Sequence, residues 1–248
     1  MADGQVGLAA ARWLVEYFRE DFALAVTTDA NAIAQLALDA GIATCVYQND
    51  EQLLAEMEQV GPIDLGMLVW WPKLIRRAII EKARVGFLNT HPSLLPYNRG
   101  KHSSFWALKE QAPFGVSLHM VDERVDSGDI VAQRPVGYCW EDTAETLYGK
   151  AQTAMVELIR DTYPLIRTLD FSRTPQNLAQ GSFHRAAEID AASRIDLHTD
   201  YRARDLLNLL RARTFTGHPG CWFEDEGQIY EVRVEIRKRR ANSSPVDV

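Results

Sequence analysis

The sequence predicts an α/β fold with a mostly parallel, doubly wound sheet, followed by a small α+β region. Two observations lead to this prediction. Over residues 1–88, short apolar runs alternate with longer runs that repeat apolar residues at helical spacing. Beyond residue 200, the pattern changes to one amphipathic helix and a hairpin. A chain of 248 residues with 46% hydrophobic residues can bury the core of one large domain with an appendage.

The first half of the chain alternates helices and strands. Helices are expected at residues 8–18, 31–40, 51–60 and 73–83, and strands at residues 23–27, 43–47, 64–70 and 85–88. Gly41 stops the second helix. Strict alternation of this kind implies βαβ units and a parallel sheet.

The second half departs from that alternation. A helix is expected within residues 100–110, strands at 115–121 and 130–136, and helices at 143–169 and 201–213. Thr143 is a plausible N-cap of the long helix, and Pro164 should kink or end it. Residues 222–223 and 229–236 suggest the hairpin. We therefore expect a catalytic domain at 1–170, a linker at 171–181, a C-terminal region at 182–238 and a disordered tail at 239–248.

Charge and composition exclude several classes of function. The net charge of −7 opposes nucleic-acid binding, and the basic run at residues 237–240 is typical of a solvated terminus. The three cysteines are far apart and lack CxxC spacing, so neither a disulfide framework nor a zinc site is expected. The six histidines do not cluster with carboxylates, and we expect no metal. Without a long apolar run or a signal pattern, we expect no membrane partner and a cytoplasmic protein.

The chemistry of the chain is indicated by two motifs. Asn89, His91 and Ser93 stand at alternate positions just after the strand at 85–88, and the carboxyl ends of parallel strands are where ligands bind. Asp126 follows in a Gly-containing loop. An amide, an imidazole and a carboxylate suit acyl transfer to an amine. Each residue alone would more often be a turn, cap or core residue, and Ser93 lacks the surroundings of a nucleophile.

The two motifs together resemble the N10-formyltetrahydrofolate-dependent formyltransferase family. The resemblance implies a Rossmann-like formyltransferase fold and the catalytic trio Asn89, His91 and Asp126. Residues 96–102, 105–106 and 113–116 are most similar to the nucleotide-sugar N-formyltransferases, and residues 182–237 resemble their C-terminal part. The first strand of this family lies in the middle of its sheet and is apparently missing here, where Asp3 and Gly4 lead almost directly into a helix. We expect either an apolar strand upstream or a gap exposing ladder groups on two neighbouring strands.

The resemblance also implies two binding regions. Contacts to the cofactor N10-formyltetrahydrofolate would come from Leu68, Trp70, Trp71, Asp122 and Val125. Contacts to the substrate would come from Tyr97, Asn98, Arg99, Lys101, His102, Arg213 and Trp222. The alternatives are a tryptophan pair in the core, solvated loop cations and a hydrophobic C-terminal mini-core. His119 is expected near the site, where its role could be only to support the other residues.

The function implied is direct formyl transfer, through an oxyanion intermediate, to the amine of a dTDP-linked amino-dideoxy sugar, by a homodimer. The alternatives are methionyl-tRNA or glycinamide ribonucleotide formyltransferase, hydrolysis of formyltetrahydrofolate, and a non-catalytic folate-binding module. The net charge opposes tRNA binding. A phosphate-binding loop rich in Gly and Ser is not matched at residues 3–7, which disfavours the ribonucleotide enzyme.

Overall fold

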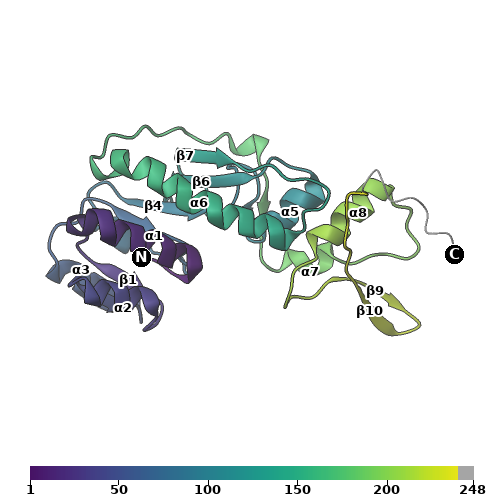
Figure 1. Ribbon diagram of the computed structural model, residues 1–248, viewed down its shortest axis with the longest axis horizontal. Coiled ribbons are helices and arrows are strands. Elements are labelled where there is room, and N and C mark those ends of the chain that lie inside the picture. Colours follow the sequence, from purple (N-terminus) through teal and green to yellow (C-terminus); the bar gives the residue numbers. More distant parts are fainter. Residues whose placement is uncertain (240–248) are drawn as a thin grey trace.

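Two sheets form the centre of the larger, N-terminal lobe in the computed structural model, which describes residues 1–239 (Figure 1). The first sheet has the order β1–β2 and the second β3–β4–β6–β7. Pairs β1–β2 and β3–β4 are parallel, whereas β4–β6 and β6–β7 are antiparallel. The strands are β1 (Ala25–Thr27), β2 (Thr44–Val46), β3 (Gly66–Leu68), β4 (Phe87–His91), β6 (Gly115–Met120) and β7 (Ile130–Pro135). The predicted α/β fold is confirmed.

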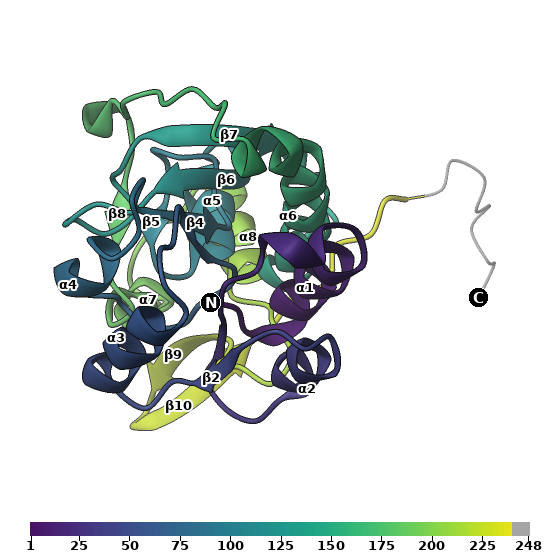
Figure 2. The same ribbon diagram turned by 90° about the vertical axis from the view of Figure 1, so that its left-hand side faces the viewer.

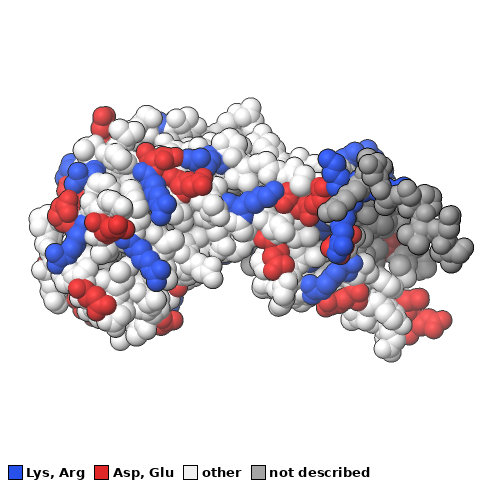
Figure 3. Space-filling model, in the orientation of Figure 1, with Lys and Arg blue, Asp and Glu red and all other residues white. Residues whose placement is uncertain are grey.

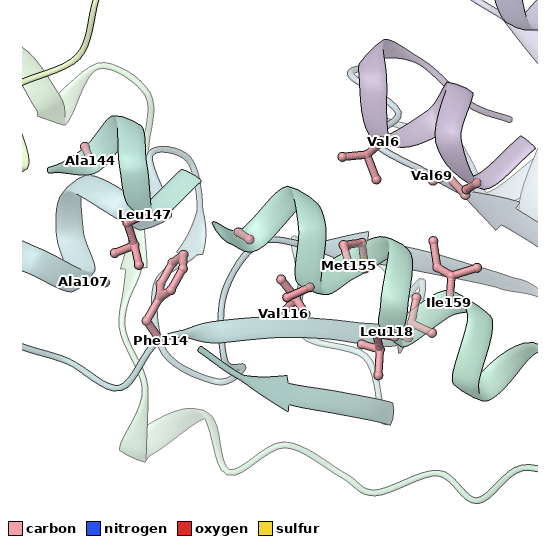
Figure 4. Close-up of a cluster of buried hydrophobic side chains, with 14 of the residues drawn as sticks. Val6, Val69, Ala107, Phe114, Val116, Leu118, Ala144, Leu147, Met155 and Ile159 are labelled. Atoms are coloured by element: carbon pink, nitrogen blue, oxygen red, sulfur yellow. The ribbon is translucent and has the colours of Figure 1, made fainter. Parts of the chain in front are cut away.

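Helices cover both faces of these sheets. They are α1 (Gly4–Phe18), α2 (Ala32–Asp39), α3 (Asp50–Gln59), α4 (Arg77–Ile80), α5 (Ser103–Glu110) and α6 (Ala144–Arg167), with a 3-10 turn at Arg19–Asp21. In Figure 4, Met155 and Ile159 of α6 lie over Val116 and Leu118 of β6. A second cluster packs α3 against Phe87 of β4. Burial on both faces explains why the strands read as continuous apolar runs.

Three of the differences from the predicted elements have a clear physical reason. Strand β4 continues through Asn89 to His91, because both residues pair with β6 where the sequence suggests a loop. Helix α4 has a single turn, in which only Ile79 is buried. Pro164 does not end α6, which continues to Arg167 because burial of neighbouring side chains offsets the lost hydrogen bond. The Thr143 cap is present, with a full capping box.

The first residues of the chain lie between the two sheets. Ala2 N–H donates to Val26 O (2.9 Å), and Val69 N–H donates to Met1 O (2.9 Å). The Met1 amino group donates to Met67 O (2.8 Å). Figures 1 and 2 accordingly place the N-terminus inside the lobe. The predicted gap is therefore present between β1 and β3, closed only at its carboxyl end by this short segment.

The C-terminal lobe contains short elements joined by loops. They are β8 (Phe183–His184), α7 (Glu188–Ala192), α8 (Ala203–Ala212), β9 (Cys221–Asp225) and β10 (Gln228–Val232), preceded by a 3-10 turn at Leu178–Gln180. Helix α8 packs against α5, and β8 pairs with β5 (Arg99–Gly100) of the larger lobe. On the face in Figure 3, basic and acidic side chains are interspersed. The predicted disordered tail lies, from residue 240 onward, outside the described residues.

Candidate active site

Strand β4 brings the predicted catalytic residues together. Asn89 and His91 are two residues apart and therefore point to the same face of the sheet. Asp126, in the loop after β6, places Oδ2 3.4 Å from His91 Nδ1 and Oδ1 3.4 Å from Asn89 Nδ2. His119 is the register partner of Asn89 on β6, and its Nε2 is 3.2 Å from Asn89 Nδ2. The structure thus assembles an amide, two imidazoles and one carboxylate.

Asp126 is held by hydrogen bonds from two other segments, the backbone of Gly100 and the side chain of Gln176. Its backbone is left-handed (φ 50°), a conformation that Asp tolerates better than most residues. Gly100 N–H donates to Oδ2 (2.9 Å). Gln176 donates through Nε2 to Asp126 O (3.1 Å) and to Gly128 O (2.7 Å). Gly128 itself leaves no space for a side chain, because an added Cβ would lie 2.0 Å from Met120 O. The carboxylate is therefore fixed in position.

His91 is almost fully buried, with 5% of its surface exposed. Its Nε2 lies 3.2 Å from Asn98 O and its Nδ1 lies 3.4 Å from Asp126 Oδ2, so both ring nitrogens face oxygens that only accept. A neutral ring donates to one of these two oxygens, and a protonated ring donates to both. Burial lowers the pKa of His91, and the charge of Asp126 only partly opposes this effect.

The surroundings of Asp126 favour the charged form of its carboxyl group. Burial alone would raise the pKa of its carboxyl group, but the neighbouring imidazoles and the Gly100 N–H lower that pKa well below its ordinary value. The carboxylate stays ionised at neutral pH. An ionised carboxylate beside an imidazole can accept one incoming proton, while the nearby amide can donate to an oxygen that becomes negative.

His119 lies directly behind Asn89. Its Nδ1 donates to Met120 O (2.8 Å), which leaves Nε2 as the acceptor for the Asn89 amide. His119 is 2% exposed. The sequence suggests that this residue lies nearby, and the β4–β6 register gives it the definite task of orienting the Asn89 amide.

Ser182 holds Asn98 in place from the C-terminal side. Asn98 N–H donates to Ser182 Oγ (3.0 Å), which in turn donates to Asn98 Oδ1 (3.1 Å). Asn98, expected to contact substrate, has no exposed surface and instead presents its carbonyl to His91. Sequence reasoning missed both Ser182 and Gln176, because no local pattern connects these residues to motifs more than 45 positions away.

Three predicted cofactor contacts, Leu68, Trp70 and Trp71, lie at the end of β3 and just after it. Leu68 is the register partner of Asn89, and its carbonyl accepts from Thr90 Oγ1 (3.1 Å). The same Thr90 hydroxyl accepts from Trp70 N–H (2.9 Å), and the Trp70 indole donates to Tyr148 OH (2.7 Å). Trp71 turns away to pack edge-on against Tyr47, with the ring centroids 5.8 Å apart.

The other two cofactor contacts lie in the Asp126 loop. Asp122 accepts from Arg124 N–H (3.1 Å) and from Ser127 Oγ (3.3 Å), which shapes the loop. Val125 keeps 40% of its surface exposed. An apolar side chain open to solvent beside the trio is available to contact a ligand.

The predicted substrate contacts separate into two groups. Arg99 lies 5.9 Å from the Phe183 ring centroid, Tyr97 is half-buried and Lys101 is exposed. Desolvation, followed by the charges of Arg213 and Lys101, lowers the pKa of His102, which places the C-terminal Arg213 near this loop. Trp222, in contrast, lies in β9 and donates its indole N–H to Asp190 O of α7 (3.2 Å).

Aromatic rings connect the two lobes beside this site. Successive centroids are 6.0 Å apart from Trp70 to Tyr148, 6.0 Å from Tyr148 to Phe215, and 4.9 Å from Phe215 to His218. Within residues 1–239, no three His, Cys, Asp or Glu side chains are grouped to hold a metal. None of the described helices is both long and apolar enough to cross a membrane.

Known structures share this architecture. A sugar N-formyltransferase from Shewanella sp. FDAARGOS_354 has a TM-score of 0.79 at 19% identity, covering 96% of this chain and 97% of its own. An N-formyltransferase from Helicobacter canadensis, in complex with folinic acid and dTDP-3-aminofucose, has a TM-score of 0.67 at 16% identity, covering 91% and 82%. A formyltransferase from Anoxybacillus kamchatkensis, in complex with a UDP-linked formamido sugar and tetrahydrofolate, has a TM-score of 0.58 at 23% identity, covering 76% and 97%.

Family comparison agrees with the fold and with the resemblance seen in the motifs. Residues 188–238 match the N-formyltransferase dimerization C-terminal domain. Residues 20–162, more than half of the chain, match the Formyl transferase family. This protein is therefore a formyltransferase and belongs to that family.

Proposed function

We propose that this enzyme transfers the formyl group of N10-formyltetrahydrofolate to the amine of a nucleotide-linked amino-dideoxy sugar, with dTDP as the nucleotide. The proposal is supported by the Helicobacter canadensis structure, which holds folinic acid and dTDP-3-aminofucose, and by the Anoxybacillus kamchatkensis structure with its UDP-linked sugar and tetrahydrofolate. The single observation that carries the proposal is the closed arrangement of Asn89, His91 and Asp126.

Asn89 is the proposed oxyanion donor. Its two amide hydrogens are directed at His119 Nε2 (3.2 Å) and Asp126 Oδ1 (3.4 Å). Donation to the formyl oxygen would replace the longer of these contacts, the one to Asp126, while His119 continues to orient the amide. One donor of this type contributes about 3–4 kcal/mol to lowering the barrier.

Asp126 and His91 are the proposed proton acceptors. The attacking amine must lose a proton as its nitrogen bonds to the formyl carbon, and the Asp126 carboxylate is ionised to receive it. Because His91 Nδ1 lies 3.4 Å from Asp126 Oδ2, the pair can share that proton and return it to the departing N10 nitrogen as the bond between the formyl carbon and N10 breaks. The resulting positive charge on the imidazole would favour the negative formyl oxygen.

The residues around the trio fit a folate. Trp70 and the exposed Val125 side chain offer apolar surface, and Leu68 and the Asp122 loop offer backbone groups. N10-formyltetrahydrofolate, when bound, supplies an activated formyl group. The chain's own residues orient it and exclude water.

The proposed nucleotide site lies between the two lobes. Arg99 Nε and Arg213 Nε are both buried without a hydrogen-bond partner in the described part of the chain. Unpaired guanidinium donors are unfavourable when buried and are typically satisfied by a phosphate. With Lys101 and His102 beside them, these groups suit the pyrophosphate of a nucleotide sugar.

We also propose that the enzyme is a homodimer. Residues 188–238 match a dimerization domain. Within that segment the β9–β10 hairpin exposes two large apolar side chains, Ile229 (70% exposed) and Tyr230 (48% exposed). Exposed apolar residues of this kind suit an interface between identical copies.

The function is tested by offering several acceptors to one enzyme. The purified chain is incubated with N10-formyltetrahydrofolate and, separately, dTDP-3-amino sugar, dTDP-4-amino sugar, UDP-4-amino sugar, glycinamide ribonucleotide and methionyl-tRNA. We expect formylation of a dTDP-linked sugar. Formylation restricted to methionyl-tRNA or glycinamide ribonucleotide contradicts the proposal.

Alanine variants test whether the activity depends on the trio. Asn89→Ala and His91→Ala should each abolish turnover, whereas the exposed His198→Ala should leave it unchanged. Far-ultraviolet circular dichroism verifies that all three variants are folded. Full activity in both trio variants would contradict the assigned roles.

A further inference from the structure

A polar cavity lies where the C-terminal lobe meets the larger lobe, beside the contact between α8 and α5 (Figure 1). Its volume is about 200 Å³, and none of the three proposed catalytic residues lines it. It is lined by Arg204, Asn208 and Arg211 of α8 and by Tyr138 and Trp140 of the loop between β7 and α6. Because the three α8 residues are four and three positions apart, they share one face of the helix.

Arg211 brings a buried positive charge to this cavity. Only 4% of its surface is exposed. Its Nη1 donates to the backbone oxygens of Cys139 and Asp142, and its Nε donates to Asn208 Oδ1 (2.9 Å), while the described residues give Nη2 no partner. All three acceptors are neutral, because the carboxylate of Asp142 pairs instead with Lys150 (2.7 Å). A buried cation without an ionised partner is unfavourable unless an anion joins it.

Arg204 places a second positive charge beside the first. Its guanidinium carbon lies 5.0 Å from the centroid of the Trp140 ring, and that of Arg211 lies 4.8 Å from the same ring. The nearby carboxylate of Asp205 is directed at Arg202 (3.9 Å). Burial lowers the pKa of the Arg211 guanidinium, and the charge of Arg204 adds to this effect. The two guanidinium groups therefore repel each other, and an anion between them would remove that repulsion.

Asn208 adds a neutral donor that also lacks a partner. Its side chain is almost fully buried, with 1% of its surface exposed. Because Oδ1 accepts from Arg211 Nε, the orientation of the amide is fixed, and Nδ2 is left without an acceptor in residues 1–239. A buried donor of this kind is commonly satisfied by a bound ion or water. None of the residues that line the cavity is an Asp or a Glu, so its walls offer positive charge and no negative charge.

We propose that this cavity binds a phosphate group, either as the free ion or on a small phosphate ester. Arg204 and Nη2 of Arg211 donate to its oxygens in charge-assisted hydrogen bonds. Pockets for drug-sized ligands have about 300–1,000 Å³, so this smaller cavity suits an ion or a small ester and not a whole nucleotide. Because Arg211 also holds the backbone at Cys139 and Asp142, just before α6, the bound phosphate stabilises the contact between the lobes.

Thermal unfolding of the full chain in phosphate tests the proposal, with sodium chloride at equal ionic strength as the reference. We expect about 10 mM inorganic phosphate to raise the unfolding midpoint by about 2–3 °C, as a dissociation constant of about 1 mM gives for a chain of this length. Ribose 5-phosphate in a parallel series shows whether the ester or the free ion binds more tightly. Acetate, with one charge, should give less than about 0.5 °C. In two-dimensional NMR, the Trp140 indole signal, identified with Trp140→Phe, should shift on titration with phosphate.

Matched substitutions locate the effect in this cavity. Arg204→Gln, at an exposed position that should not affect folding, should remove the gain in midpoint, whereas the neighbouring exposed Arg202→Gln should preserve it. Arg99→Gln, at the proposed nucleotide site, should also preserve the gain, which separates the two sites. A midpoint and a Trp140 signal that both stay unchanged in phosphate overturn the proposal. So does a gain that survives Arg204→Gln, or one that acetate reproduces in full.

Discussion

The buried Met1 amino group should make the stability of the protein depend on pH between 5 and 8. Its pKa is 8.0 in the unfolded chain and about 5 in the folded one. As the pH falls from 8, the unfolded chain binds a proton that the folded chain does not, so the unfolded state is favoured. Stability from this group is fully present above pH 8 and is lost progressively down to pH 5.

The magnitude follows from the size of the pKa shift. Three pKa units at about 1.36 kcal/mol each give a loss of about 4 kcal/mol at and below pH 5. At pH 7, one unit below the unfolded pKa, the loss is about 1.4 kcal/mol. N-terminal acetylation removes the titrating group and retains an N–H for the bond to Met67 O. The acetylated chain should therefore lose this part of its pH dependence.

Urea unfolding of the free and acetylated chains at pH 5, 7 and 9 measures the difference. Intact mass must verify that residue 1 is retained in both. Any constant gain from packing of the acetyl group cancels, because only the change between pH values is compared. We expect the advantage of the acetylated chain to grow by about 4 kcal/mol from pH 9 to pH 5. If the free and acetylated chains show the same change in unfolding free energy with pH, the idea that Met1 carries a buried, neutral amine is refuted.

Four further substitutions have defined consequences. Asp126→Asn should lower kcat at least about 100-fold with a small change in KM, because the proton acceptor is lost while the shape is retained. Ser182→Ala removes both contacts to Asn98, and it should destabilise the fold by about 1–2 kcal/mol in urea and shift the His91 titration in NMR. Thr143→Ala removes the cap of α6 and should cost about 1 kcal/mol. Leu118→Ala, at a fully buried site, should cost about 2–5 kcal/mol.

Each of these expectations has an outcome that contradicts it. An unchanged kcat in Asp126→Asn would show that the carboxylate does not accept the proton. An unaltered His91 titration in Ser182→Ala would show that the Asn98 carbonyl does not depend on Ser182. For the two stability variants, Thr153→Ala on α6 serves as the control and should change the unfolding free energy by less than about 0.5 kcal/mol.

The local parts of the site could be predicted from the sequence, and the long-range parts could not. Asn89 and His91 follow an apolar strand at spacing two, and the alternation of side chains along a strand places both on one face. Asp126 is indicated by the Gly-containing turn in which it lies. The role of Asn98 is different, because its burial and its contact with His91 depend on Ser182, a residue 84 positions away. Likewise, the strand predicted at 85–88 ends too early, because Asn89 to His91 become extended through pairing with β6.

The pairing of β5 with β8 has a consequence for how the two lobes can be used. Arg99 and Gly100 pair with Phe183 and His184, and Gly100 is also the residue that donates to Asp126. Removing everything after residue 180 would therefore delete part of the support for the acid–base pair along with the C-terminal lobe. If the smaller lobe of this enzyme were replaced by that of a relative, the residues that support proton transfer would change with it. The smaller lobe is therefore not an independent module.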